Sequence, residues 1–182
     1  VNGMEWTAGL PELLLAASAM ILLMVGAFGG ERASRPLAWL AIAVLVLVGG
    51  VLLGTAPQER SAFGGFFVTD AFAVFMKILV LVGAAGGILL SLDFNARAKI
   101  ERFEYPILIL FASLGMMMMI SAGDLMSLYL GLELQSLTLY VIAAFHRDSA
   151  RSTEAGLKYF VLGALASGLY LYGASLIYGF AG

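Results

Sequence analysis

The sequence predicts an all-α integral membrane protein with six transmembrane helices. Hydrophobic residues make up 62% of the 182 residues, charged residues make up 12%, and the mean hydropathy is +0.98. Soluble domains average roughly 45–50% apolar and about 25% charged residues, so this chain has too much apolar surface for one water-soluble core. The apolar residues also gather into six segments of bilayer-spanning length, separated by polar turns.

The six expected helices follow one another with short connections. The first begins near Leu10 and carries Pro11 in its first turn, where a helix tolerates proline. Asp70 and Asp124 precede the third and fifth segments, and we expect their carboxylates to cap those helices. The expected spans are about 10–28, 37–54, 71–92, 105–121, 124–145 and 152–182.

The longest polar connection, residues 55–69, lies between the second and third spans. Gly64 and Gly65 stand in it between Phe63 and the pair Phe66 and Phe67. Glycine pairs flanked by aromatic residues favour a short interfacial β-hairpin. An irregular loop with aromatic rings at the headgroup level explains the same residues equally well.

Basic residues in the turns predict the orientation in the membrane. The turns after the first, third and fifth helices hold seven lysines and arginines, whereas the opposite side holds only Arg60. Cytoplasmic loops carry the excess of positive charge, so both ends of the chain are expected on the non-cytoplasmic side. The seven residues are Arg32, Arg35, Arg97, Lys99, Arg102, Arg147 and Arg151.

The composition also limits the chemistry. The chain has no cysteine, which excludes disulfides, thiolate catalysis and cysteine-bound metals or clusters. The single histidine, His146, lies in a polar turn and cannot form a metal site alone. No nucleotide-binding or metalloprotease motif occurs, and no basic patch favours nucleic acid. The start of the chain lacks the basic segment of a cleavable signal peptide.

Glu133 is the strongest candidate for a functional side chain. It lies near the middle of the fifth span, where an ionised group costs roughly 2.5–3.5 kcal/mol or more. Polar residues at helical spacing share its face, which favours a water-lined path between helices. The alternative is a structural glutamate that holds two helices together. The residues on this face are Tyr129, Ser136 and Tyr140.

Lys77 and Lys158 are the other two of the three ionisable residues that we count inside the spans. Lys77 either extends toward water or forms a local ion pair, or else it belongs to a proton path. Lys158 either accepts and releases a proton or pairs with Glu154 one turn earlier. Small residues at the spacing that allows close helix packing occur in two pairs, Gly163 with Ser167 and Ala164 with Gly168, and we assign them no chemistry.

Four stretches closely resemble one family, subunit N of the bacterial NADH–quinone oxidoreductases, or respiratory complex I. Its mitochondrial counterpart is the second ND core subunit. The most specific stretches are GLELQSLTLY and EAGLKYFVLGALASGL, while FGGFFVTDAFAVFMK and FEYPILILFASLGMMMMISAGDL are also similar. Related subunits and Mrp-type antiporters usually have Trp-Glu at the position of Leu132 and Glu133.

The resemblance implies a proton-translocating membrane-arm subunit of an enzyme that couples NADH oxidation and quinone reduction to proton pumping. It implies no redox centre in this chain, with FMN, iron–sulfur clusters and quinone bound by partner subunits. The expected partners are the other membrane-arm subunits and the lipid of the bacterial inner membrane. An Mrp-type cation/proton antiporter subunit and a structural membrane scaffold remain alternatives.

The resemblance also assigns roles to residues. The family's fifth-helix glutamate corresponds to Glu133 and its sixth-helix lysine to Lys158, both for proton translocation. The lysine with which that glutamate pairs stands on an interrupted seventh helix and has no position here. Residues 1–103 correspond to three leading helices and residues 104–182 to the first three helices of an antiporter-like repeat. Other candidates for the proton path are Lys77, Tyr129, Ser136 and Tyr140.

Overall fold

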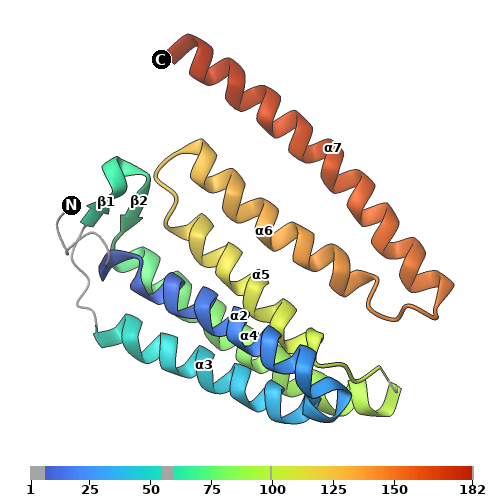
Figure 1. Ribbon diagram of the computed structural model, residues 1–182. Coiled ribbons are helices and arrows are strands. Elements are labelled where there is room, and N and C mark those ends of the chain that lie inside the picture. Colours follow the sequence, from blue (N-terminus) through green and yellow to red (C-terminus); the bar gives the residue numbers. More distant parts are fainter. Residues whose placement is uncertain (1–6, 55–59, 99, 182) are drawn as a thin grey trace.

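The computed structural model describes residues 7–54, 60–98 and 100–181, and it is a bundle of long helices with one small hairpin (Figure 1). Residues 55–59 of the polar connection and Lys99 lie outside the described residues. The elements are α2 (Leu10–Gly29), a 3-10 turn (Gly30–Ala33), α3 (Ser34–Gly54), β1 (Arg60–Ala62), a second 3-10 turn (Phe63–Gly65), β2 (Phe67–Thr69), α4 (Ala71–Ala98), α5 (Glu104–Ile120), α6 (Leu125–Ala143) and α7 (Ala150–Ala181).

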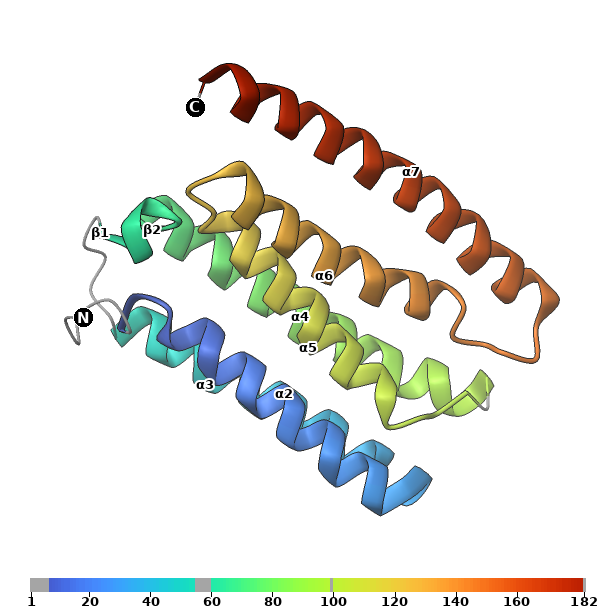
Figure 2. The same cartoon turned by 45° about the horizontal axis from the view of Figure 1, so that its top comes forward.

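The predicted class, an all-α multi-pass membrane protein, is confirmed. Five of the described helices are long and apolar enough to cross a bilayer. The sixth, α5, has 17 apolar-rich residues and a length of about 25 Å, near the lower limit for a span. It nevertheless lies inside the bundle, against α2, α3, α4 and α6 (Figure 2).

One predicted boundary is wrong: the third expected span stops near residue 92, but α4 continues to Ala98. Its 28 residues measure about 42 Å, well beyond a hydrocarbon core of about 30 Å. The added turns carry the polar residues Asp93 and Asn95. The prediction was based on hydropathy, which shows only where a helix leaves the hydrocarbon core. The backbone hydrogen bonds of α4 continue beyond that point into the headgroup region.

Both expected N-caps are confirmed. The Asp70 carboxylate accepts a hydrogen bond from the Ala73 N–H at 2.6 Å, and the Asp124 carboxylate accepts one from the Ser127 N–H at 2.9 Å. Hydrogen bonds from Ser127, from its side chain first and then its backbone, hold the pKa of Asp124 below its ordinary value. Each carboxylate therefore satisfies an otherwise unpaired N–H where its helix begins.

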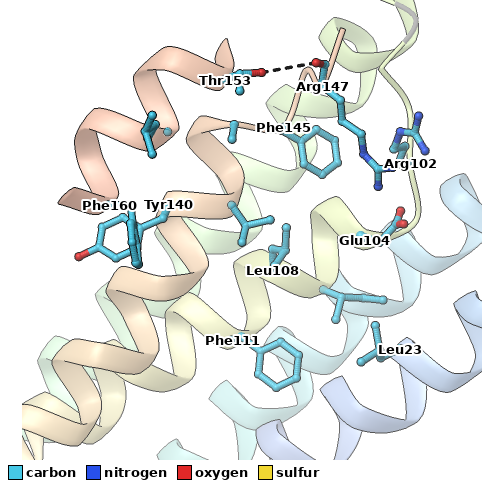
Figure 3. Close-up of a pocket in the computed structure, with 15 residues that line it drawn as sticks. Leu23, Arg102, Glu104, Leu108, Phe111, Tyr140, Phe145, Arg147, Thr153 and Phe160 are labelled. Carbon is cyan, nitrogen blue, oxygen red and sulfur yellow. Dashed lines mark hydrogen bonds between the residues drawn. The ribbon is translucent and has the colours of Figure 1, made fainter. Parts of the chain in front are cut away.

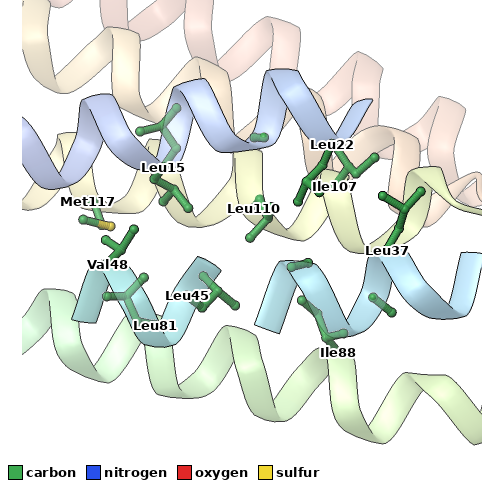
Figure 4. Packing of buried hydrophobic residues seen from close by; sticks show 14 of the residues in the cluster. Leu15, Leu22, Leu37, Leu45, Val48, Leu81, Ile88, Ile107, Leu110 and Met117 are labelled. Carbon is green, nitrogen blue, oxygen red and sulfur yellow. The ribbon is translucent and has the colours of Figure 1, made fainter. Parts of the chain in front are cut away.

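The buried core belongs to α2, α3, α4 and α5 (Figure 4). Its fully buried side chains are mainly leucines, with smaller residues where helices approach closely. No fully buried member comes from α6 or α7 among the described residues, although Leu134 of α6 packs against the core. The central residues are Leu15, Leu37, Leu45, Val48, Leu81, Ile88, Ile107, Leu110 and Met117.

Two glycines join α6 to this core by letting its backbone approach α5 closely. A Cβ on Gly115 would come within 2.7 Å of the Gly131 carbonyl oxygen, and a Cβ on Gly131 within 2.8 Å of the Gly115 oxygen. Contacts between glycines of this kind allow transmembrane helices to pack backbone against backbone. In contrast, α7 lies along the outer side of α6 and is mostly exposed (Figures 1 and 2).

The hairpin prediction is confirmed, and the irregular loop is excluded for residues 60–69. Strands β1 and β2 pair antiparallel, with Ala62 opposite Phe67. The hairpin also binds the turn between α5 and α6: the Val68 N–H donates to the Ser121 carbonyl at 2.8 Å, and the Gly123 N–H donates to the Phe66 carbonyl at 2.9 Å. The small sheet therefore holds the residues that begin α6.

Gly123 provides a test of this attachment. A Cβ at this position would overlap the Gly65 carbonyl oxygen, so Gly123→Ala must displace the hairpin or the start of α6. We expect a loss of roughly 1–3 kcal/mol in unfolding free energy, measured by thermal unfolding in detergent. Gly83→Ala is the control, because a Cβ on this glycine of α4 meets no atom within 4 Å. Equal melting temperatures for the two variants would contradict the attachment.

Candidate functional site

Glu133 lies in the interface between α6 and α7. It stands nine residues after the capping Asp124, about 13 Å along the helix axis, and is half-buried. Its Oε1 atom accepts a hydrogen bond from the Ser167 hydroxyl of α7. The carboxyl group therefore faces another helix at depth in the bundle, with a neutral hydroxyl group as its partner.

Aromatic contacts between the same two helices flank this hydrogen bond. Tyr129 stacks on Tyr170 with ring centroids 5.7 Å apart. At the other end, Tyr140 makes edge contacts with Tyr159 and Phe160 at 4.8 and 5.7 Å. The predicted polar face of α6 is thus turned toward α7.

The remaining member of the predicted face is Ser136. It is half-buried, three residues after Glu133 on the same side of α6. A second contact near the start of α6 fixes α7, because the Tyr170 hydroxyl donates to the Leu125 carbonyl at 2.9 Å. Side-chain contacts between α6 and α7 therefore lie on both sides of Glu133 along the interface.

Ser167 is a residue whose role the sequence analysis missed. Its spacing from Gly163 correctly indicates the face of α7 that packs on another helix, and both residues are partly buried. The assignment of close packing is confirmed for Gly163 and Ser167, and the Ser167 hydroxyl also donates to Glu133; it is wrong for Ala164 and Gly168, which are exposed. A polar residue on the packing face of a predicted span was the available signal, but spacing within α7 cannot identify a partner 34 residues away.

Lys158 does not meet Glu133 in this structure. It lies nine residues before Ser167, which is two and a half helical turns and therefore the opposite face of α7. Its side chain is 70% exposed and its Nζ atom lies 2.5 Å from the Glu154 carboxylate. Of the two interpretations of Lys158, a proton carrier or an ion pair with Glu154, the structure shows the ion pair.

Lys77 forms a buried ion pair at the hairpin end of the bundle. Its Nζ atom lies 2.6 Å from Glu12 Oε1, and the two side chains are 1% and 8% exposed. The same ammonium group stands over the Phe67 ring, 4.9 Å from the centroid. Lys77 therefore does not extend to water, and the local ion pair is the alternative that the structure contains.

The sequence-based count of three acidic and basic residues inside the spans is wrong, because Glu12 lies well inside the first span and Asp124 and Glu154 lie at the starts of the fifth and sixth. Glu12 lies in the first turn of α2, directly after Pro11, within the first predicted span. Glu12 and Lys77 both stand near the hairpin ends of their helices, and that shared depth was the signal for a pair. The ion pair joins α2 to α4. The order of the helices in the sequence does not show that these two helices meet.

The described residues contain no cluster of three or more His, Asp or Glu side chains close enough to hold a metal ion. The candidate site consequently consists of carboxyl, hydroxyl, phenol and ammonium groups. These groups bind and release protons or form hydrogen bonds. Chemistry of this kind is suited to moving protons between helices.

Residues 122–182 match a family model described as NADH:quinone oxidoreductase/Mrp antiporter, transmembrane. This segment contains α6 and α7, and with them Glu133, Ser167 and Lys158. The contacts between α6 and α7 thus lie within the segment that matches this model, whereas the ion pair of Lys77 and Glu12 lies outside it.

Over almost its whole length the chain is also similar to NADH-quinone oxidoreductase subunit N. It is 58% identical over 178 residues to that subunit from Parvibaculum lavamentivorans and 57% identical over 179 residues to that from Rhodobacter capsulatus. Each alignment covers 98% of this chain but 37% of the relative, so the chain spans little more than a third of their length. The resemblance to subunit N is confirmed.

A solved structure shares the fold. A chain of the membrane-bound sulfane sulfur reductase, an archaeal respiratory membrane complex, superposes with a TM-score of 0.77 and 22% sequence identity. The match covers 94% of this chain and 37% of the other. At this identity the likeness shows the arrangement of helices alone.

The buried ion pair makes a prediction about stability. Lys77→Met fills a similar volume but leaves Glu12 buried without its cation, which should cost about 3–5 kcal/mol of unfolding free energy. The double variant Glu12→Leu with Lys77→Met replaces both charges by apolar groups and should recover most of that loss. Thermal unfolding of the purified variants measures both. A double variant as unstable as Lys77→Met would show that the pair is not the source of the effect.

Proposed function

We propose that this chain is the N-terminal part of a subunit-N-type membrane-arm subunit of an NADH–quinone oxidoreductase. In this proposal it translocates protons, while NADH oxidation and quinone reduction take place at FMN, iron–sulfur clusters and quinone held by partner subunits. The observation that carries the proposal is Glu133, a carboxyl group at depth in the α6–α7 interface whose partner is the neutral Ser167 hydroxyl. The identities of 55–58% to subunit N support the choice of complex.

The chemistry of Glu133 follows from its surroundings. Partial burial disfavours the charged carboxylate, whereas a hydrogen bond donated to it or a nearby cation favours it. Glu133 combines partial burial with a hydrogen bond donated by Ser167. Acidic residues at this depth in a membrane are mostly functional, because their cost would otherwise be removed by substitution.

We propose supporting roles for the residues around Glu133. Tyr129, Ser136 and Tyr140 supply hydroxyl groups along the same face of α6, which suits a relay of protons toward Glu133. Lys158 is assigned to the same route on the strength of the family resemblance, acting from the exposed face of α7. Lys77 is assigned a different role, since its pairing with Glu12 gives it a structural function that needs no proton transfer.

A second candidate function is that of an Mrp-type cation/proton antiporter subunit. The description of the matching family model covers both kinds of protein, so the match at residues 122–182 does not choose between them. The curated relatives favour the oxidoreductase, because those quoted above carry that name. A structural scaffold is the third candidate, and the variants below separate it from a proton path.

We also propose an orientation in the bacterial inner membrane. The turns after α2, α4 and α6 would face the cytoplasm and the hairpin would face the opposite side, as the distribution of basic residues favours. The other membrane-arm subunits would contact the exposed apolar faces of the bundle.

Glu133→Gln tests the proposed proton path. The amide keeps the shape and hydrogen-bonding capacity of glutamate but cannot release a proton, so proton translocation should fall by about ten-fold or more. Glu133→Asp should lie between the amide and the native residue. Proton uptake and NADH–quinone turnover are measured in proteoliposomes and normalised to assembled complex. Native translocation by the Gln variant would remove Glu133 from the path, and loss of assembly alone would favour the scaffold.

Ser167→Ala tests the positioning of that carboxyl group. Loss of one hydrogen bond should lower proton translocation by roughly two- to ten-fold without loss of assembly and shift its pH profile. Ser175→Ala is the matched control on the same helix, because Ser175 is exposed and donates only to the Tyr172 carbonyl one turn earlier. An effect of equal size in both variants would show that the change is not specific to Glu133.

Cysteine labelling tests the orientation. The chain contains no cysteine, so single cysteines at Ser61 on β1 and Ala98 at the end of α4 report without background. Both positions are exposed. An impermeant reagent should label Ser61→Cys from the non-cytoplasmic side and Ala98→Cys from the cytoplasmic side. Labelling of both from one side would contradict the helix count, and exchanged sides would reverse the orientation.

A further inference from the structure

A cavity of about 360 Å³ lies at the hairpin end of the bundle, between α2, the hairpin, α5 and α6. Its walls are mainly apolar, with the rings of Phe66 and Phe67 on the hairpin and with Leu114 and Met118 on α5. A larger cavity, of about 610 Å³, lies at the other end of the bundle (Figure 3). The two cavities share no lining residue among those that the structure describes.

Glu12 is an acidic residue on the wall of the cavity at the hairpin end, and one of its two carboxylate oxygens lacks a partner. The side chain is 8% exposed, and its Oε1 atom contacts the Lys77 ammonium group. The Oε2 atom is buried and has no hydrogen-bond partner among the residues that the structure describes. A buried carboxylate oxygen without a donor is costly. A ligand in the cavity that offers a donor would remove this cost.

Ser127 of α6 is a second polar side chain on the described wall. Its hydroxyl group donates to the Asp124 carboxylate, so it has no proton left for Glu12. The oxygen of the same hydroxyl can still accept a hydrogen bond. Glu12 and Ser127 therefore both offer acceptors to the cavity, and a fitting ligand must bring the donors.

The ion pair limits the charge of that ligand. Lys77 already balances the charge of Glu12, so a cation in the cavity would add a buried charge that the pair does not neutralise. Water would supply donors, but a buried water typically makes about three hydrogen bonds, and most of this wall is apolar. The rings of Phe66 and Phe67 favour contact with another ring. The wall thus selects a neutral aromatic ligand with hydroxyl groups.

We propose that this cavity binds a hydroquinone, the reduced form of a membrane quinone. One phenolic hydroxyl would donate to Glu12 Oε2, in a hydrogen bond that the charge of the carboxylate strengthens. The other would donate to Ser127, and the ring would pack against Phe66. The oxidised quinone carries acceptors in place of both donors and would leave Glu12 Oε2 unsatisfied. The site should therefore distinguish the two redox states.

This site goes beyond the proposed function, in which partner subunits hold the quinone. It depends on that proposal only for the supply of hydroquinone. The volume is near the lower end of the roughly 300–1,000 Å³ of ordinary ligand pockets, which suits one ring with the start of its tail. Leu13 and Leu130 line the cavity and are exposed, so the rest of the tail can continue along them into lipid.

Photoaffinity labelling tests the site on the chain purified with the proteins to which it is assembled in its membrane. The probe is a decyl hydroquinone with a diazirine on the tail beside the ring, used either reduced or oxidised, and labelled peptides are mapped by mass spectrometry. We expect the reduced probe to label the segments around Leu13 and Phe66 about ten-fold more than the oxidised probe does. Equal labelling by the two forms would overturn the hydrogen bond to Glu12.

The double variant Glu12→Leu with Lys77→Met tests the carboxylate without leaving a buried charge. Its preference for the reduced probe should disappear, and a preference that persists would show that Glu12 is not the acceptor.

Ala16→Leu tests the cavity itself, because the larger side chain fills part of it and should lower labelling about ten-fold. Ala17→Leu is the matched control, since Ala17 is exposed on the same helix and does not line the cavity. Equal labelling in these two variants would overturn the site.

Competing ligands separate a hydroquinone from other neutral occupants. Unlabelled decyl hydroquinone should displace the probe, whereas a monoacylglycerol with the same tail, which has hydroxyl groups but no ring, should not. Equal competition by both would overturn the choice of an aromatic ligand. Labelling no greater than that of Ala16→Leu would mean that water alone fills the cavity and would overturn the proposal. Neither labelling nor competition depends on proton translocation, so this site and the proposed function can fail separately.

Discussion

The close crossing of α5 and α6 is the contact on which the rest of this structure depends. The buried core comprises α2, α3, α4 and α5, whereas the candidate site lies between α6 and α7. Gly115 and Gly131 let the two backbones approach within van der Waals distance, and this joins the site to the core. In lipid there is little hydrophobic driving force between helices, so close packing must supply the attachment. Any side chain at either glycine would separate α6 from the core.

The buried ionisable groups are held in two different ways. Lys77 and Glu12 neutralise each other across α2 and α4, and the Phe67 ring covers the ammonium group. Glu133 has the neutral hydroxyl of Ser167 as its hydrogen-bond partner. Removal of either member of the ion pair would leave the other charge buried and unpaired. Glu133 is thus held by a hydrogen bond between two helices and not by an opposite charge that the structure describes.

The hairpin links these two regions. Phe67 stands over Lys77, and its strand is hydrogen-bonded to the turn that precedes α6. Asp124 caps α6 directly after that turn, and the Tyr178 hydroxyl of α7 donates to the same carboxylate at 3.2 Å. The end of the bundle near the hairpin is thus fixed through several elements. At the opposite end, a cavity of about 610 Å³ lies between α5, α6 and α7.

The sequence by itself determined the class of protein, the approximate spans and both aspartate caps, and it selected Glu133 as the candidate that the proposed function uses. Each of these depends on local hydropathy, on spacing along one helix or on the cost of a charge in lipid. The tertiary structure alone decided which helices meet. It paired Lys77 with Glu12, gave Glu133 the hydroxyl of Ser167, and turned the Ser167 face of α7, not the Lys158 face, toward α6. Periodicity identifies the face that a residue occupies, but the partner of that face is set by packing between segments distant in the chain.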